Sequence, residues 1–74
     1  MAAVKFTCKT SSKRHHEEIR RKTYLAGGSI LREKITKDTS SAFEGEFEII
    51  SEGGTLFRDV KENGLAIYAN LLNS

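Results

Sequence analysis

Proline is absent from this chain of 74 residues, so none of its turns can depend on it. Six glycines remain to make the sharp turns, and they include Gly-Gly steps at residues 27–28 and 53–54. Neither step belongs to a GxGxxG or GxxxxGK[ST] pattern, so a phosphate-binding loop has no support. We interpret both steps as turns.

Cysteine is nearly absent, and the single Cys8 excludes a disulfide within the chain. Small secreted domains usually carry several cysteines, so we expect a cytoplasmic location. Cys8 alternates with polar residues in a short predicted strand, on the side expected to face the core. We interpret it as a small buried apolar residue, because a nucleophile would need a nearby base.

Long apolar runs are also missing. No stretch approaches the ~20 residues of a membrane span, and the first residues lack an apolar run of signal-peptide length, so we expect no membrane partner. The length predicts one small α+β domain over residues 1–74. Such a chain buries only about 60% of its unfolded surface, and a partner or second copy can supply missing apolar area.

The charge is unevenly distributed along the chain. Residues 1–22 contain seven Lys or Arg and two Glu, a balance of +5. Residues 23–38 contain three bases and two acids (+1), and residues 39–74 contain two bases and six acids (−4). This bipolar pattern indicates a basic end that can meet a polyanion, or an acidic surface of the same fold or of a second copy.

Hydrophobic periodicity predicts the elements of the first half. Alternation over residues 3–9 predicts a strand, and hydroxyl N-caps followed by Gly27 predict a helix over residues 12–26. A strand over residues 29–36 follows, before a polar loop over residues 36–41. The alternative is a hairpin turning at Gly27-Gly28, with Lys22 opposite Glu33.

Alternation in the second half predicts a hairpin over residues 43–60, whose returning strand is "TLFRDV". The favoured register places Glu48 opposite Arg58 and Ile49 opposite Phe57. A terminal helix over residues 60–72 is predicted from a buried stripe at helical spacing, namely Leu65, Tyr68, Ala69 and Leu72. The predicted fold class is α+β, a small antiparallel sheet of three or four strands with one or two helices on one face.

The stretch "KRHHEEIRRK" at residues 13–22 is the candidate nucleic-acid site. Side chains two helical turns apart suit adjacent phosphates of DNA or RNA, whereas Glu17 and Glu18 would repel them. The alternative is a solvated helix face crossed by ion pairs. The candidate phosphate-binding residues are Lys9, Lys13, Arg14, Arg20, Arg21 and Lys22.

An acidic row over residues 44–48 is the candidate protein-binding site. Glu44, Glu46 and Glu48 occupy alternate positions of a predicted strand and are expected to face solvent. They can bind a basic protein partner, although exposed strand positions give the same pattern without any partner.

No motif predicts an enzyme, a cofactor, a metal or a small-molecule substrate. His15 and Glu18 are three residues apart, but a closed zinc site needs about four ligands and neither CxxC nor HExxH occurs. We therefore predict a non-enzymatic binding module that contacts nucleic acid through its basic N-terminal half. The alternative is a protein-interaction module, homodimeric or not, that uses the acidic face, a sheet edge or the last helix.

Overall fold

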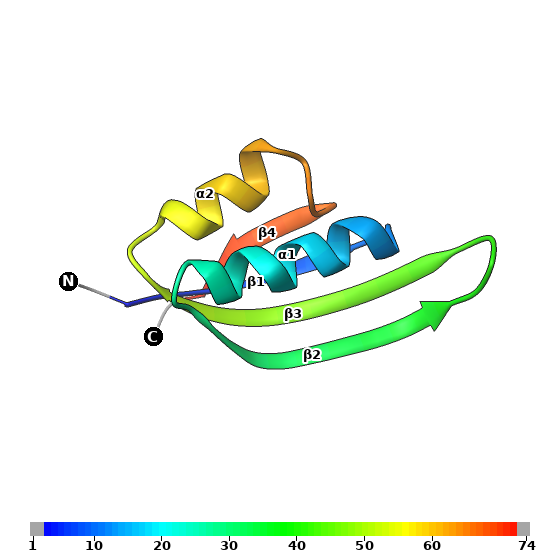
Figure 1. Cartoon of the computed structure of the whole chain (residues 1–74), viewed down its shortest axis with the longest axis horizontal. Coiled ribbons are helices and arrows are strands. Elements are labelled where there is room, and N and C mark those ends of the chain that lie inside the picture. The colour runs from blue at the N-terminus through cyan, green and yellow to red at the C-terminus, as the bar shows by residue number, and fades with distance from the viewer. Residues whose placement is uncertain (1–2, 73–74) are drawn as a thin grey trace.

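The computed structural model describes residues 3–72, which form one sheet and two helices (Figure 1). The elements in chain order are β1 (Ala3–Thr10), α1 (Lys13–Leu25), β2 (Ser29–Asp38), β3 (Phe43–Glu52), α2 (Thr55–Glu62) and β4 (Tyr68–Leu71). The sheet is antiparallel in the order β2-β3-β1-β4, and both helices cover one of its faces. This split β-α-β arrangement confirms the α+β class.

The first half follows the pattern of the sequence. Phe6, Cys8 and Thr10 are buried at alternate positions of β1. Helix α1 begins after Ser12, whose hydroxyl accepts a hydrogen bond from the His15 N–H, and it is followed by Gly27 at φ 75°. Because α1 continues to Leu25, the alternative hairpin over this region is wrong.

Strand β3 was predicted with the correct faces and the wrong partner. Its alternate residues from Phe43 to Ser51 are buried, as expected. It pairs with β2 on one side and β1 on the other, so Glu48 lies opposite Arg32 and Thr7 rather than Arg58. The register with "TLFRDV" is wrong because that segment is helix α2.

The last third of the chain departs from the prediction. Leu56 and Val60 are buried four residues apart on α2, which is the spacing of a helix turn. The predicted helix over residues 60–72 is wrong: α2 ends at Glu62, and Tyr68–Leu71 forms β4 beside β1. Of the expected buried stripe, namely Leu65, Tyr68, Ala69 and Leu72, only Leu65 is buried.

The core lies between the sheet and the two helices. Sheet residues Phe6, Phe47 and Ile49 pack against Ile19 of α1 and Val60 of α2. Phe6 also makes an edge-to-face contact with Phe57, with ring centroids 5.4 Å apart. The opposite face of the sheet carries neither helix (Figure 1), and the side chains that β1 and β3 place on it are mostly half-buried.

Candidate functional site

The basic residues of α1 are mostly engaged by carboxylates. Arg20 pairs with Glu33, and Arg21 pairs with Glu18 one turn away. From the ends of the helix, the Lys13 Nζ lies 3.7 Å from an Asp38 carboxylate oxygen and the Lys22 Nζ lies 3.1 Å from one of Asp59. These pairs agree with a solvated helix face, the alternative interpretation of this stretch.

The six candidate phosphate-binding residues do not share one surface. Lys13, Arg14, Arg20, Arg21 and Lys22 belong to α1, on the helical side of the sheet. Lys9 belongs to β1 between two inward-facing residues, Cys8 and Thr10, so it faces the opposite side. There its Nζ lies 4.0 Å from the Glu44 carboxylate.

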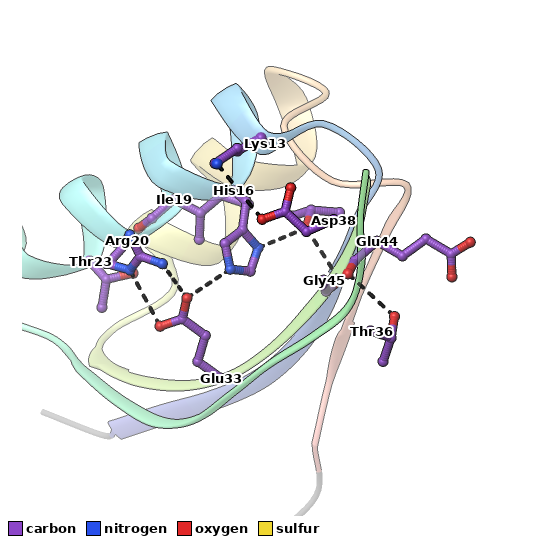
Figure 2. Close-up of polar contacts among 11 residues, drawn as sticks. Lys13, His16, Ile19, Arg20, Thr23, Glu33, Thr36, Asp38, Glu44 and Gly45 are labelled. Atoms are coloured by element: carbon purple, nitrogen blue, oxygen red, sulfur yellow. Dashed lines mark hydrogen bonds and ion pairs between the residues drawn. The ribbon is translucent and has the colours of Figure 1, made fainter. Parts of the chain in front are cut away.

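His16 is the buried polar residue that the sequence prediction missed, at 1% exposed. Its Nδ1 lies 2.8 Å from the Thr10 hydroxyl. Its Nε2 lies 2.8 Å from the Glu33 carboxylate (Figure 2). The Thr10 hydroxyl lies within hydrogen-bond distance of both His16 Nδ1 and, at 3.2 Å, the Gly45 carbonyl. A signal was present, because His16 precedes the buried Ile19 by three residues and continues its stripe.

Two aromatic rings and a glycine hold the His16 ring in place. The ring stacks on Phe47 with centroids 4.1 Å apart and meets the edge of Phe43 at 5.2 Å. A Cβ at Gly45 would lie 2.6 Å from the ring atoms, so only glycine leaves room at that position. This packing and the full set of hydrogen bonds describe a structural histidine that ties α1 to β2 and β3.

Glu33 joins this buried histidine to the surface of α1. Its carboxylate accepts hydrogen bonds from both Arg20 and His16, and its side chain is 25% exposed. The hydrogen bond from Arg20 is the main reason that the Glu33 pKa is lowered; partial burial opposes the shift and His16 adds to it. The same pairing raises the pKa of Arg20.

The acidic row of β3 lies between rows of basic side chains. Glu46 is opposite Lys9 on β1 and Lys34 on β2, and Glu48 is opposite Arg32. The three glutamates are half-buried rather than fully exposed. On the open face of the sheet, the charge of the side chains therefore alternates in sign from strand to strand. This alternation weakens the case for an acidic stripe directed at a basic partner.

The two edges of the sheet differ in their protection against further strand pairing. Edge strand β2 contains five charged residues in ten, and its pairing with β3 is interrupted by irregularities at Leu31 and Thr36. Charges and bulges of this kind are how proteins prevent sheet edges from pairing with other chains. Edge strand β4 has the sequence YANL, with no charge, and its register with β1 is regular.

Apolar side chains gather around the β4 edge. Ile67 is 60% exposed and Leu71 is 56% exposed, and Tyr68 and Leu72 are exposed as well. Next to this edge, a groove of about 530 Å³ runs between α2 and β4. Its lining residues are Val4, Gly54, Phe57, Arg58, Lys61, Glu62 and Leu71.

The groove combines an apolar floor with a charged rim. Val4, Phe57 and Leu71 supply the apolar surface, while Arg58, Lys61 and Glu62 lie on α2 above it. The Lys61 Nζ lies 5.7 Å from the centre of the Phe57 ring, a distance at which the cation is attracted to the ring face. This shape suits an extended, partly apolar segment lying alongside β4.

A second hollow, of about 490 Å³, lies between α1 and the start of β2. Tyr24, Thr23 and Ile30 line it together with Arg20 and Arg21, both of which are held by glutamates. The adjacent edge is the charged and irregular β2 strand. Strand pairing is therefore less favourable on this side of the molecule than at β4.

Reactive and metal-binding groups are not assembled in the described part of the chain. Burial raises the pKa of the Cys8 thiol to about 12, so it stays protonated near neutral pH and is a poor nucleophile. Within residues 3–72, no three His, Cys, Asp or Glu side chains are placed to hold a metal ion. No helix in the same range is long and apolar enough to cross a membrane.

Comparisons of the chain with protein-family models, with curated proteins and with solved structures find no match.

Proposed function

We propose that this chain is a non-enzymatic protein-interaction module that binds an extended segment of a partner protein by strand addition to β4. The contrast between the two sheet edges supports this proposal. Strand β2 carries charges and irregular pairing that oppose association, whereas β4 is uncharged, regular and surrounded by exposed apolar side chains.

The groove beside β4 suggests the chemistry of the bound segment. A strand placed there directs alternate side chains towards Val4, Phe57 and Leu71, so those positions of the partner are apolar. Arg58, Lys61 and Glu62 on the rim carry charges of both signs, so the rim does not select a segment of one charge.

Selection from a displayed library of short random peptides tests this function without a known partner. We expect enriched peptides to alternate apolar and polar residues, and their binding to weaken with Leu71→Ala. The matched control is Leu31→Ala on the β2 edge, because Leu31 is about as exposed (49%) as Leu71 (56%). Failure to enrich any peptide, or equal weakening by both substitutions, would contradict the proposal.

Nucleic-acid contact is the second candidate function, favoured by the five basic residues of α1. It ranks below the first because four of these five are paired with carboxylates, and because Lys9 lies on the other face of the sheet. Its mechanism would be phosphate neutralisation with little reading of base sequence.

A further inference from the structure

Two residues of β4 direct their backbone N–H and C=O groups towards solvent. The Leu72 N–H donates to the Lys5 carbonyl at 2.8 Å, and the register places Asn70 opposite Thr7. Because hydrogen-bonding direction alternates along an antiparallel strand, Asn70 also faces β1, while Ala69 and Leu71 direct their N–H and C=O groups outward. A strand added to this edge must bond to those two residues.

This spacing allows β4 to pair with itself. In an antiparallel pair related by a twofold axis at Asn70, Ala69 of each copy bonds with Leu71 of the other, giving four backbone hydrogen bonds. On the open face of the sheet, Tyr68 then lies opposite Leu72 of the second copy, twice, and Asn70 lies opposite itself. Apolar side chains meet apolar ones, and an amide meets an amide.

Shifting the register by two residues in either direction is worse. One shift places Tyr68 opposite Asn70, and the other places Leu72 opposite Asn70, so each pairs an apolar side chain with an amide. The self-complementary register is therefore the one centred on Asn70.

Charge does not oppose this association. Strand β4 is uncharged, and α2, which flanks it, has two basic residues, Arg58 and Lys61, and two acidic ones, Asp59 and Glu62. The corresponding self-pairing of β2 centred on Glu33 would bring two carboxylates together beside the two irregular positions of that strand.

We infer that the partner bound at β4 is a second copy of this chain, in a twofold dimer that joins the two sheets through β4 into one of eight strands. This inference rests on the proposed function and identifies its partner. The groove beside β4 would then be continued by Ala69 and Leu71 of the second copy, which face the helical side.

Sedimentation of the whole chain tests the dimer. We expect the wild type to be dimeric at tens of micromolar. We expect Leu71→Pro, which removes one outward N–H from each copy without removing a bond to β1, to weaken dimerisation on the order of 100-fold. Leu71→Ala keeps this N–H and should weaken dimerisation less. A wild type that is monomeric, or a Leu71→Pro protein as dimeric as the wild type, would overturn the inference.

A cross-link tests the register and does not depend on Leu71→Pro folding. Opposed residues of a non-hydrogen-bonded pair have Cβ atoms about 4.5–5.5 Å apart, close to the reach of a disulfide. Asn70→Cys should therefore form a covalent dimer under mild oxidation, whereas Lys34→Cys on the other edge should not. The buried native Cys8 is common to both. A covalent dimer from Lys34→Cys but not from Asn70→Cys would overturn the inference.

Different results would contradict the proposed strand addition at β4 and the inference that the partner is a second copy. A monomeric chain that still binds selected peptides, and loses them with Leu71→Pro, would exclude the second copy and leave the strand-addition function intact. A chain that neither dimerises nor binds peptides at β4 would contradict both. Dissociation of the dimer by such a peptide would support both.

Discussion

At the scale of single residues, Gly45 and His16 fit together so closely that each limits what can replace the other. A Cβ at position 45 would lie 2.6 Å from two atoms of the His16 ring and 3.0 Å from the Thr10 hydroxyl. The ring is enclosed by Phe43 and Phe47 and cannot move aside without breaking its hydrogen bonds. The pair therefore fixes the distance between α1 and β3.

Gly45→Ala should consequently lower the free energy of unfolding by about 1–3 kcal/mol, the usual cost of overpacking a core. Gly54→Ala is the matched control, because its new Cβ would meet nothing within 4 Å. Alanine at position 54 is a weaker N-cap for α2, which lowers the stability, but it also restricts the unfolded chain, which raises the stability. We expect these two effects to cancel to within about 0.5 kcal/mol. Urea denaturation measures both variants, and equal values would show that the His16 ring has room to move.

Glu33 should make stability depend on pH in the acid range. Because Arg20 holds its pKa below the ordinary value in the folded state, Glu33 contributes stability that is present above about pH 4.3, the unfolded pKa. That contribution is lost as the pH falls through the lower folded pKa. Glu33→Gln should therefore be less stable than the wild type at pH 7 and lose less stability on acidification.

Urea midpoints between pH 7 and pH 2.5 test this, with Glu52→Gln at the exposed end of β3 as the control. If the urea midpoint falls equally steeply with decreasing pH in Glu33→Gln and in the wild type, the Arg20–Glu33 pair does not contribute to the stability.

At the scale of secondary structure elements, the sequence predicted β1, α1 and β3 because each has one periodicity and clear ends, whereas β2 was predicted beside an alternative hairpin. The prediction failed after Glu52. The six-residue segment "TLFRDV" is too short to distinguish two buried residues four apart from a strand. Apolar residues over 65–72 fit helical spacing only because they occupy both faces of a strand, which the edge position of β4 permits.

The candidate site shows the same limit. The exposed positions of α1 and the alternation of β3 were predictable from local sequence. The pairing of Arg20 with Glu33, and of β4 with β1, joins residues far apart in the chain. Neither periodicity nor spacing specifies such contacts, so the basic and acidic surfaces were predicted without the partners that neutralise them.

The corrected boundaries of α2 and β4 give a direct test at two leucines. Leu65 is 9% exposed in the core and Leu72 is 38% exposed beside β4. Leu65→Ala should cost about 2–5 kcal/mol of unfolding free energy, whereas Leu72→Ala should cost well under half of that. Denaturation of both variants as dilute monomers checks this, and equal losses would favour the predicted terminal helix over the observed strand.

The basic side chains on both sides of the β3 glutamates give a prediction about stability. Glu46→Lys places a third cation between Lys9 and Lys34, so it should cost about 1 kcal/mol. Glu46→Gln removes the attraction without adding repulsion and should cost less. Thermal or urea unfolding at low salt measures the difference, which added salt should reduce. Equal stability of the two variants would show that these rows do not interact.

At the scale of the whole molecule, the basic and acidic halves of the sequence are brought into contact. The +5 balance of residues 1–22 meets Glu33, Asp38 and Asp59 through α1, and meets the β3 glutamates through β1. The bipolar sequence therefore folds into a molecule whose opposite charges are interleaved.

Duplex DNA or RNA should accordingly show no binding to tens of micromolar protein at 50 mM salt, as measured by filter binding. If α1 instead neutralised about five phosphates, affinity would fall with a log–log salt slope near −4.5. A slope of that size, reduced by about two in the Arg20→Ala, Arg21→Ala variant, would place nucleic-acid binding above protein interaction.

The position of β1 between β3 and β4 also affects the order in which the strands pair during folding. The β2–β3 hairpin closes between Asp38 and Phe43, five residues apart, whereas β1 meets β4 through Thr7 and Asn70, about sixty residues apart. Closing the longer loop costs about 2 kcal/mol more chain entropy. We expect the hairpin to form early and β4 to dock last, so that during synthesis β1 has one open side until the ribosome has released residue 72.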